Sequence, residues 1–129
     1  MAAQAGFKGL EAWQVAMGLV EVIYQATATW PSHEQFGLTN QVRRAAVAVP
    51  SNIAEGHGRK SPGDFIRFVS IALGSLSELE TQILIAGRLG YLPEPHAQPL
   101  IERIHETTRV TQGFARFLKR TAPQTTKNQ

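Results

Sequence analysis

The chain has 129 residues, a formal charge of +3 at pH 7 and no cysteine. This length suits one domain with its own core, and the lack of cysteine excludes disulfide scaffolds, thiol nucleophiles and cysteine-ligated metal sites. The sequence shows neither a signal-peptide pattern nor an apolar segment of membrane-spanning length, so we expect a soluble cytoplasmic protein without a membrane partner. The mildly basic charge permits contact with nucleic acid without requiring it.

A loose tail is expected over residues 1–9, followed by a helix that ends at Trp30-Pro31. The seam by which this helix packs on other helices is predicted from a 3-4 spacing of mostly apolar residues: Leu10, Trp13, Met17, Val20, Tyr24 and Thr27. The opposite flank is apolar as well, from Ala12 to Ala26. A helix that is apolar nearly all round is buried on more than one side.

The second helix is predicted from about Leu38 to Glu55, with Pro50 inside it and a stop at Gly56-His57-Gly58. Proline lacks an N–H and clashes with the carbonyl four residues back, so we expect a kink or a break near residues 46–49. Two interpretations stay open for Asn52: it bonds to a carbonyl that the proline leaves free, or it faces a partner. Glu55 is interpreted in the same way.

The third helix has a clear start, with Ser61 as N-cap, Pro62 at the first helical position and Asp64 at the third. It is predicted to extend to about Leu89 and to end at Gly90. Two neighbouring apolar stripes run along it. The first contains Phe65, Phe68, Ala72, Ser75, Leu79, Gln82 and Ala86, and the second contains Ile66, Val69, Leu73, Leu76 and Ile83.

A proline-rich lead-in from Pro93 to Pro99 precedes the fourth helix, and Pro99 suggests that the regular helix begins there. The seam of this helix is predicted to contain Leu100, Ile104, Thr107, Thr111, Phe114 and Leu118. Arg109, Arg116 and Arg120 lie opposite this seam and are therefore expected to face solvent. Residues 122–129 are polar, and we expect them to be disordered.

Four long helices without a strand signal predict an all-α, antiparallel up-and-down four-helix bundle over residues 10–121. The two apolar flanks of the first and third helices further predict a homo-oligomer, because one small bundle can bury only one flank of each helix.

Nothing in the sequence predicts an enzyme, a cofactor or a metal site. The four histidines are scattered, and the Glu-x-x-His spacing of di-iron bundles occurs once, at Glu102 and His105. A single occurrence on an amphipathic helix is typical of a solvated pair, since a di-iron site needs two such motifs.

Polar residues on the second and third helices form one candidate site. Arg43 and Arg44 lie on the second helix, and Glu78, Glu80 and Gln82 lie on the third. A buried carboxylate is costly unless it is paired, and arginine matches it with two parallel hydrogen bonds. We expect a buried ion-pair and amide network that fixes the register of the bundle. The alternative is a polar pocket for a ligand.

Basic residues form the other candidate site. Arg59, Lys60 and Arg67 cluster around the start of the third helix, where free N–H groups favour anions. Arg109, Arg116 and Arg120 add a stripe on the fourth helix, and these are also interpreted as cations that complement the dipole of a helix C-terminus. No aromatic residues are interleaved with these cations in the sequence, which argues against readout of single-stranded bases.

Several motifs resemble a known bacterial family. They are Phe7-x-x-Leu10, Trp13-Gln14-x-Ala16, Phe36-Gly37-Leu38, Gln41-x-Arg43-Arg44-Ala45-Ala46, Pro50-Ser51-Asn52-Ile53-Ala54-Glu55-Gly56, Arg59, Ala72-x-Gly74-Ser75-x-x-Glu78-x-Glu80-Thr81-Gln82 and Gly90-Tyr91-Leu92. The family is named for proteins encoded in intervening sequences of 23S ribosomal RNA genes, and it is similar to accessory variability proteins of diversity-generating retroelements. The resemblance implies a ring-like homopentamer, nucleic-acid binding and no established enzymatic activity. The name ribosomal protein S23, which some members carry, does not imply a place in the ribosome.

The leading hypothesis is a non-enzymatic oligomeric bundle that binds nucleic acid, RNA rather than DNA, through the basic residues. The alternative is a scaffold or assembly factor without nucleic-acid contact, whose protein partner docks at a groove around Arg43, Asn52, Glu55 and Glu78. A third hypothesis is an enzyme or a small-ligand binder.

Overall fold

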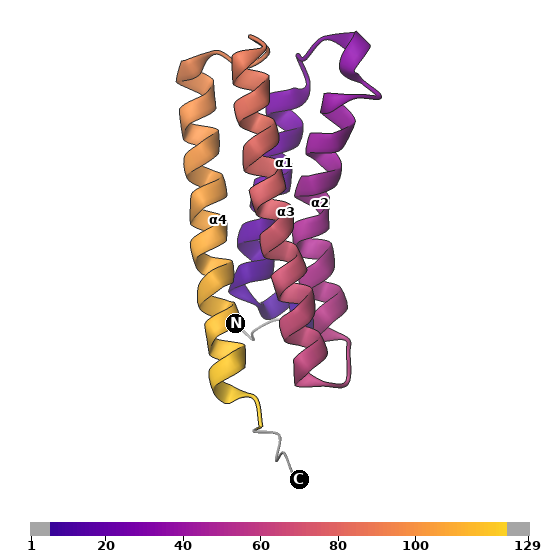
Figure 1. The fold of residues 1–129 in the computed structure, drawn as a ribbon, viewed down its shortest axis with the longest axis vertical. Helices are drawn as coiled ribbons and strands as arrows, with labels where there is room; N and C mark the ends of the chain where they lie inside the picture. The colour runs from indigo at the N-terminus through magenta and orange to yellow at the C-terminus, as the bar shows by residue number, and fades with distance from the viewer. Residues whose placement is uncertain (1–5, 124–129) are drawn as a thin grey trace.

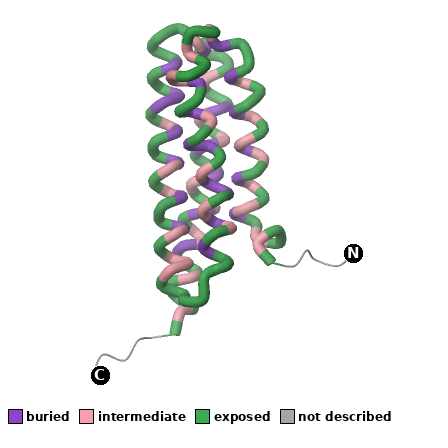
Figure 2. Tube along the Cα trace, turned by 90° about the vertical axis from the view of Figure 1, so that its right-hand side faces the viewer, coloured by how far each residue is buried: buried purple, intermediate pink, exposed green. Residues whose placement is uncertain are grey.

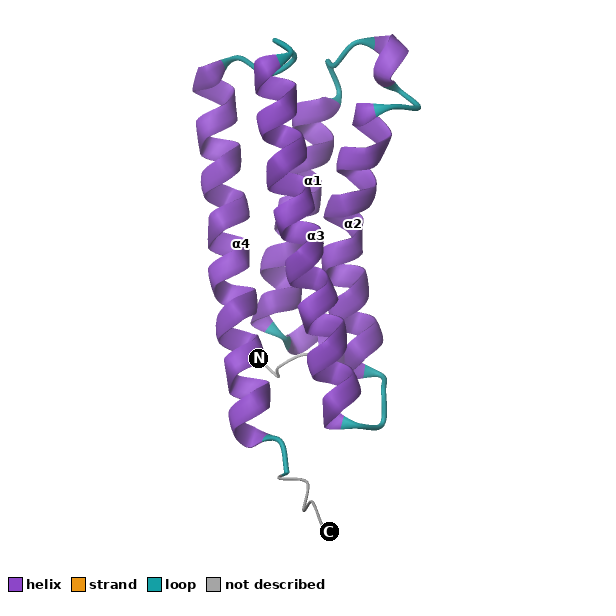
Figure 3. Cartoon of the chain, viewed as in Figure 1, coloured by secondary structure: helices purple, strands orange, loops and turns teal. Residues whose placement is uncertain are grey.

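The computed structural model describes residues 6–123, and within that range it contains helices and connections but no strand (Figure 3). The long helices are α1 (Glu11–Thr27), α2 (Leu38–His57), α3 (Pro62–Arg88) and α4 (Glu94–Thr121). Two short 3-10 helices precede α1 and α2: η1 (Gly6–Gly9) and η2 (Ser32–Glu34). The prediction of an all-α protein with four long helices is confirmed.

The four helices lie side by side, and the chain passes along the length of the molecule in each of them (Figure 1). Helix α1 packs against α2 and α4, and α3 packs against the same two helices. The α1–α2 and α3–α4 connections lie at the end drawn at the top of Figure 1, here called the upper end. The α2–α3 connection and the end of α4 lie at the lower end.

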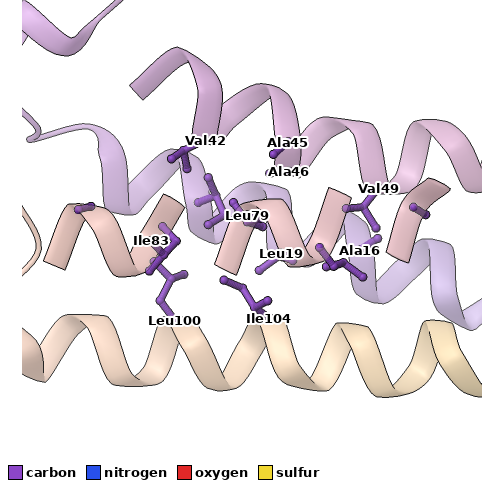
Figure 4. Packing of buried hydrophobic residues seen from close by; sticks show 14 of the residues in the cluster. Ala16, Leu19, Val42, Ala45, Ala46, Val49, Leu79, Ile83, Leu100 and Ile104 are labelled. Carbon is purple, nitrogen blue, oxygen red and sulfur yellow. The ribbon is translucent and has the colours of Figure 1, made fainter. Parts of the chain in front are cut away.

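The core lies along the central axis of the bundle, as the buried positions in Figure 2 and the side chains in Figure 4 show. On α1 it is formed by the flank that contains Ala12, Ala16, Leu19 and Ile23. The predicted seam of α1 was wrong at Met17 and Tyr24, which are exposed. Its other members pack against the core or are buried: Leu10, Trp13, Val20 and Thr27.

On α3, the buried side chains come from both predicted stripes, because the core contacts the line between them. They are Val69, Ala72, Leu76, Leu79, Gln82, Ile83 and Ala86. By length and composition alone α3 could cross a membrane, contrary to the sequence expectation. This is weak support for a membrane span, since a helix that supplies a bundle core has the same composition.

Proline does not interrupt the helices where the sequence predicted it. Helix α2 is continuous through Pro50, which is buried, and no break occurs at residues 46–49. Asn52 Nδ2 donates a hydrogen bond to the carbonyl of Ala48 at 2.8 Å. This is not the carbonyl of Ala46, which lacks its helical N–H donor because residue 50 is proline. Pro50 lies on the buried face of α2, next to Val49 and Ile53.

Helix α4 begins at Glu94, earlier than the predicted start at Pro99. Pro93 is the N-cap and Pro95 lies in the first turn, where backbone N–H groups have no helical partner, whereas Pro99 lies inside the helix. The carbonyl of Pro93 accepts from the backbone N of His96 at 2.9 Å and of Ala97 at 3.0 Å, which closes that turn. The predicted buried seam of α4 is otherwise found, with Leu100, Ile104, Thr107 and Thr111 buried and Ala115 added to it.

Both predicted ends of α3 are confirmed. Ser61 Oγ accepts from the backbone N of Asp64 at 3.0 Å. At the other end Gly90 has φ 81°, and the backbone N of Tyr91 donates to the carbonyl of Ala86 at 3.0 Å, which is a Schellman motif. The first cap fixes how the chain enters α3, and the second fixes how it leaves.

The tails predicted to be loose lie partly outside the described residues, which exclude 1–5 and 124–129. Residues 6–9, expected within the loose N-terminal tail, instead form η1. The Phe7 ring packs edge-on against Trp13, with 5.4 Å between ring centroids, which holds η1 against α1.

Candidate nucleic-acid interface

The α2–α3 connection and the end of α4, which carry most of the predicted basic residues, lie at the same lower end of the bundle (Figure 1). Arg59 and Lys60 from the α2–α3 connection line one shallow pocket of about 290 Å³ with Leu118 and Thr121 from the end of α4. The cations of the α2–α3 connection, the first turns of α3 and the last turns of α4 are here called the basic end. They are Arg59, Lys60, Arg67, Arg116, Lys119 and Arg120.

Two members of the basic end are paired with carboxylates of their own helix or connection. Arg59 Nη2 lies 2.8 Å from Glu55 Oε2, and Arg67 Nε lies 3.9 Å from Asp64 Oδ1. All four side chains are solvent-exposed, and exposed ion pairs of this kind contribute little free energy and are screened by salt. A phosphate can therefore compete for these two arginines.

The other four members, Lys60, Arg116, Lys119 and Arg120, form no ion pair within residues 6–123. All four are exposed, as the sequence predicted for the two arginines. Lys119 was not predicted as a site residue, although its place beside Arg120 in the last turn of α4 was a signal for it.

Aromatic rings lie among these cations, contrary to the expectation from the sequence. Arg59 and Arg67 both stack on the Phe68 ring, with their Cζ atoms 4.9 Å and 4.7 Å from its centroid. Arg120 lies 6.0 Å from the centroid of Phe117, which is an exposed ring. The i, i+3 spacing of Phe117 and Arg120 was the signal in the sequence that could have indicated this.

Arg109 does not belong to the basic end. It lies higher on α4, where it lines a groove between α1 and α4 of about 850 Å³, here called the α1–α4 groove. The predicted arginine stripe of α4 is thus divided between two surfaces.

The predicted ion pairing of Arg43 with Glu78 or Glu80 was wrong. Arg43 turns toward α1, where its Nε donates to Thr27 Oγ1 at 2.8 Å and its Nη2 donates to the carbonyl of Tyr24 at 3.3 Å. Its Cζ also lies 4.4 Å from the centroid of the Tyr24 ring. Arg43 therefore joins α2 to the last turn of α1.

The remaining polar candidates are dispersed. Glu80 Oε2 lies 2.9 Å from His105 Nε2 of α4, while Arg44 and Glu78 are exposed and form no ion pair in the described part of the chain. Gln82 is 7 % exposed, and its Oε1 has no hydrogen-bond partner. The single buried network that the sequence predicted is not present.

Metal chemistry finds no support in the geometry, since no three His, Asp or Glu side chains within residues 6–123 are grouped to hold an ion. Together, the fold and the site define a small helical-bundle protein with a cationic end. The chain belongs to the family of 23S rRNA-intervening sequence proteins, whose family model matches residues 8–113.

The bundle is also similar to a solved structure from Bacteroides thetaiotaomicron, described as a protein with unknown function from the S23 ribosomal protein family. The two share 18% sequence identity with a TM-score of 0.73, over 81% of this chain and 95% of the other. At this identity the likeness shows a common fold alone. No curated protein matches the chain.

Proposed function

We propose that this protein is a non-enzymatic, self-assembling bundle, with its helices in antiparallel up-and-down order, that binds nucleic acid in the cytoplasm. The observation that carries the proposal is that the two segments carrying six exposed cations lie at the same end of the bundle. Glu55 and Asp64 are the carboxylates paired with two of these cations. Clustered cations of this kind bind phosphates and release counterions from the nucleic acid.

RNA is the preferred ligand over DNA. The name of the family, which refers to 23S rRNA, supports this choice. The exposed Phe117 ring beside Arg120 supports it further, because unpaired bases stack on aromatic side chains while cations hold the backbone. The basic end thus suits a single-stranded segment or a loop.

Self-assembly is supported by large apolar side chains that the single bundle leaves exposed. Apart from Phe117 at the basic end, they are Met17, Tyr24, Phe36, Val47, Ile71, Leu84, Ile85 and Leu89. Neighbouring exposed apolar side chains, such as Leu84, Ile85 and Leu89 at the end of α3, are typical of an interaction site. We propose that this surface is covered in a homo-oligomer, and the family resemblance favours a pentamer.

The test is a mobility-shift titration with a labelled single-stranded RNA over a range of salt concentrations. The double variant Arg116→Glu/Arg120→Glu should lower the affinity strongly at about 50 mM salt, and less at high salt where the phosphate contacts are screened. Arg88→Glu, compared with Arg120→Glu alone, is the matched control, because it reverses one exposed charge on α3 at the upper end. Absence of binding at low salt, or equal binding by all variants, would contradict the proposal.

A scaffold role without nucleic-acid contact is the second candidate. The observation that favours it is the exposure of Leu84, Ile85 and Leu89 on the last turns of α3, which a protein partner could cover. A pull-down that recovers a defined protein, and retains it after nuclease treatment, would support this role over the first.

A further inference from the structure

The last turn of α1, the connection before α2 and the first three turns of α2 line a pocket of about 530 Å³, here called the α1–α2 pocket. It lies at the upper end, where α1 ends and α2 begins (Figure 1). Its volume falls in the range of about 300–1,000 Å³ that is usual for small-molecule sites. The side chains that give it chemical character are two arginines, two aromatic rings and two amides: Tyr24, Gln35, Phe36, Asn40, Arg43 and Arg44.

The charge of the α1–α2 pocket is positive. Arg43 and Arg44 line it, no Asp or Glu of the described chain does, and neither arginine forms an ion pair within residues 6–123. Glu21, one turn before Tyr24 on α1, is not a lining residue. Both carboxylate oxygens of Glu34, which precedes the connection, already accept hydrogen bonds. Two uncompensated arginines in one pocket favour an anionic ligand.

Arg43 is held in place with donors to spare. Its Nε donates to Thr27 Oγ1 at 2.8 Å, and its Nη2 donates to the carbonyl of Tyr24 at 3.3 Å. A guanidinium carries five N–H donors in a fixed fork, so the N–H groups that these bonds do not use stay available to a ligand. Arg44 follows directly and is exposed. A phosphate suits this pair, because its oxygens accept several charge-assisted hydrogen bonds at once.

Aromatic rings lie beside these cations. The Tyr24 ring packs against Arg43, whose Cζ lies 4.4 Å from the ring centroid. Phe36 is 90% exposed, and a hydrogen bond of 2.9 Å from the backbone N of Gly37 to the carbonyl of Glu34 holds its segment. An aromatic ring held out in water beside cations is a stacking surface for a nucleobase.

The lining residues are within reach of one small molecule. Asn40, Arg43, Arg44 and Val47 follow the i, i+3, i+4, i+7 spacing of a single helix face. Along the chain the Asn40 amide lies between Phe36 and the arginines, and it can both donate to and accept from the polar edge of a base. The order of ring, amide and cations matches the order of base, polar edge and phosphate in a nucleotide.

We propose that the α1–α2 pocket binds a nucleotide, whose base stacks on Phe36 and whose phosphate lies on Arg43 and Arg44. The pocket is separate from the basic end at the lower end of the bundle, and neither proposal requires the other. A free nucleotide and the terminal nucleotide of an RNA strand present the same chemistry to this pocket. When such a ligand covers Phe36, the exposed apolar side chains of α3 remain for the contact between copies.

Calorimetric titration with each of the four ribonucleoside monophosphates tests the site, with the four nucleosides and inorganic phosphate as controls. At least one monophosphate should bind about 10-fold or more tightly than both its nucleoside and inorganic phosphate, because it alone engages the ring and the arginines together. Equal affinity for inorganic phosphate would show an anion site without a base and overturn the proposal. Binding of none of the four would overturn it as well.

Arg44 and Phe36 are the residues to change, because both are exposed and their loss should leave the circular dichroism spectrum unchanged. Arg44→Ala should weaken monophosphate binding by roughly 10-fold, and Phe36→Leu by about 5-fold or more. Phe36→Tyr keeps the ring and should bind like wild type. Arg88→Ala is the control for Arg44→Ala, because it removes an exposed arginine at the same end. Wild-type affinity in Arg44→Ala or in Phe36→Leu would overturn the assignment.

An RNA with a 5′-phosphate separates the two sources of the nucleotide. Weaker binding of this RNA by Arg44→Ala would support a strand whose terminal nucleotide enters the pocket. An effect of Arg44→Ala on the monophosphate alone would support a free nucleotide.

The double variant Arg116→Glu/Arg120→Glu separates this pocket from the basic end. It should lower the affinity for RNA and leave the affinity for the monophosphate unchanged. Loss of monophosphate binding in this variant, with Arg44→Ala unaffected, would place the nucleotide at the basic end and overturn the α1–α2 pocket. RNA binding that ignores the double variant would contradict the basic end and leave the α1–α2 pocket standing.

Discussion

The hydroxyl of Tyr91 donates a hydrogen bond of 2.8 Å to Glu34 Oε2, and it thereby joins the two connections at the upper end of the bundle. The other carboxylate oxygen accepts from the backbone N of Leu38 at the start of α2. The bond from Leu38, and then the bond from Tyr91, lower the pKa of Glu34, while the same carboxylate raises the pKa of Tyr91. Gly37 permits this arrangement, because a Cβ there would lie 2.5 Å from Glu34 Oε1.

We predict that Glu34→Gln destabilises the protein at neutral pH and that the effect fades in acid. A carboxyl group whose pKa is lowered by folding contributes stability above its unfolded pKa and loses it as the pH falls through the folded pKa. The difference in free energy of unfolding between wild type and variant should therefore shrink between neutral pH and about pH 3. Urea unfolding at several pH values measures it, with Glu21→Gln on the exposed face of α1 as control. A difference that grows in acid would contradict the interpretation.

Gly56 and Gly74 provide a matched pair of helical glycines. A Cβ on Gly56 would lie 2.7 Å from the Phe68 Cβ and 2.9 Å from the Phe65 Cδ1, whereas nothing lies within 4 Å of a Cβ on Gly74. Gly56→Ala should lower the free energy of unfolding by about 1–3 kcal/mol through overpacking. Gly74→Ala should raise it by roughly 0.5–1 kcal/mol through helix propensity. Equal effects in thermal and urea unfolding would argue against close α2–α3 packing at Gly56.

A buried and an exposed leucine of α3 test the position of the core. Leu76 is buried and Leu84 is exposed on the same helix. We expect Leu76→Ala to lower the free energy of unfolding by about 2–5 kcal/mol, because a cavity remains in the core. Leu84→Ala should change it by less than about 0.5 kcal/mol in dilute protein. Similar losses in the two variants would place the core elsewhere.

The slope of RNA affinity against salt concentration should distinguish the cations of the basic end from Arg109. Each phosphate contact at a single strand contributes about 0.7 to this slope on logarithmic axes, so Arg120→Gln and Lys60→Gln should each reduce it by roughly that amount. Arg109→Gln should leave the slope unchanged, because Arg109 lines the α1–α4 groove and not the basic end. A slope that responds to Arg109 as strongly as to Arg120 would show that the ligand follows the whole of α4.

The number of long helices and their ends at Ser61 and Gly90 could be predicted from the sequence, because periodicity and capping are local signals. The buried flank of α1 could not be chosen, since both flanks are apolar and the choice depends on how closely α2 and α4 approach. The break expected at Pro50 was predicted from local chemistry alone, and it does not occur. Local chemistry disfavours Pro50 in a helix, but the packing of the α2 core face keeps the helix continuous.

For the candidate site, the residue types were predicted better than their partners. The basic residues are exposed as expected, yet their division into the basic end and the α1–α4 groove depends on where α4 lies along the bundle. Arg43 shows the limit most clearly. Its position on α2 was predicted, but its turn toward Thr27 and Tyr24 of α1 depends on side-chain geometry that spacing along one helix does not contain.

The crowding of cations at one end has a consequence for binding strength. In the proposed homo-oligomer, subunits that present this end in the same direction would let a single nucleic-acid strand touch several of them at once. Each additional contact would form at the high effective concentration set by its tethered neighbours. Modest attraction at each subunit would then add up to strong avidity, and dissociation of the oligomer would release the strand.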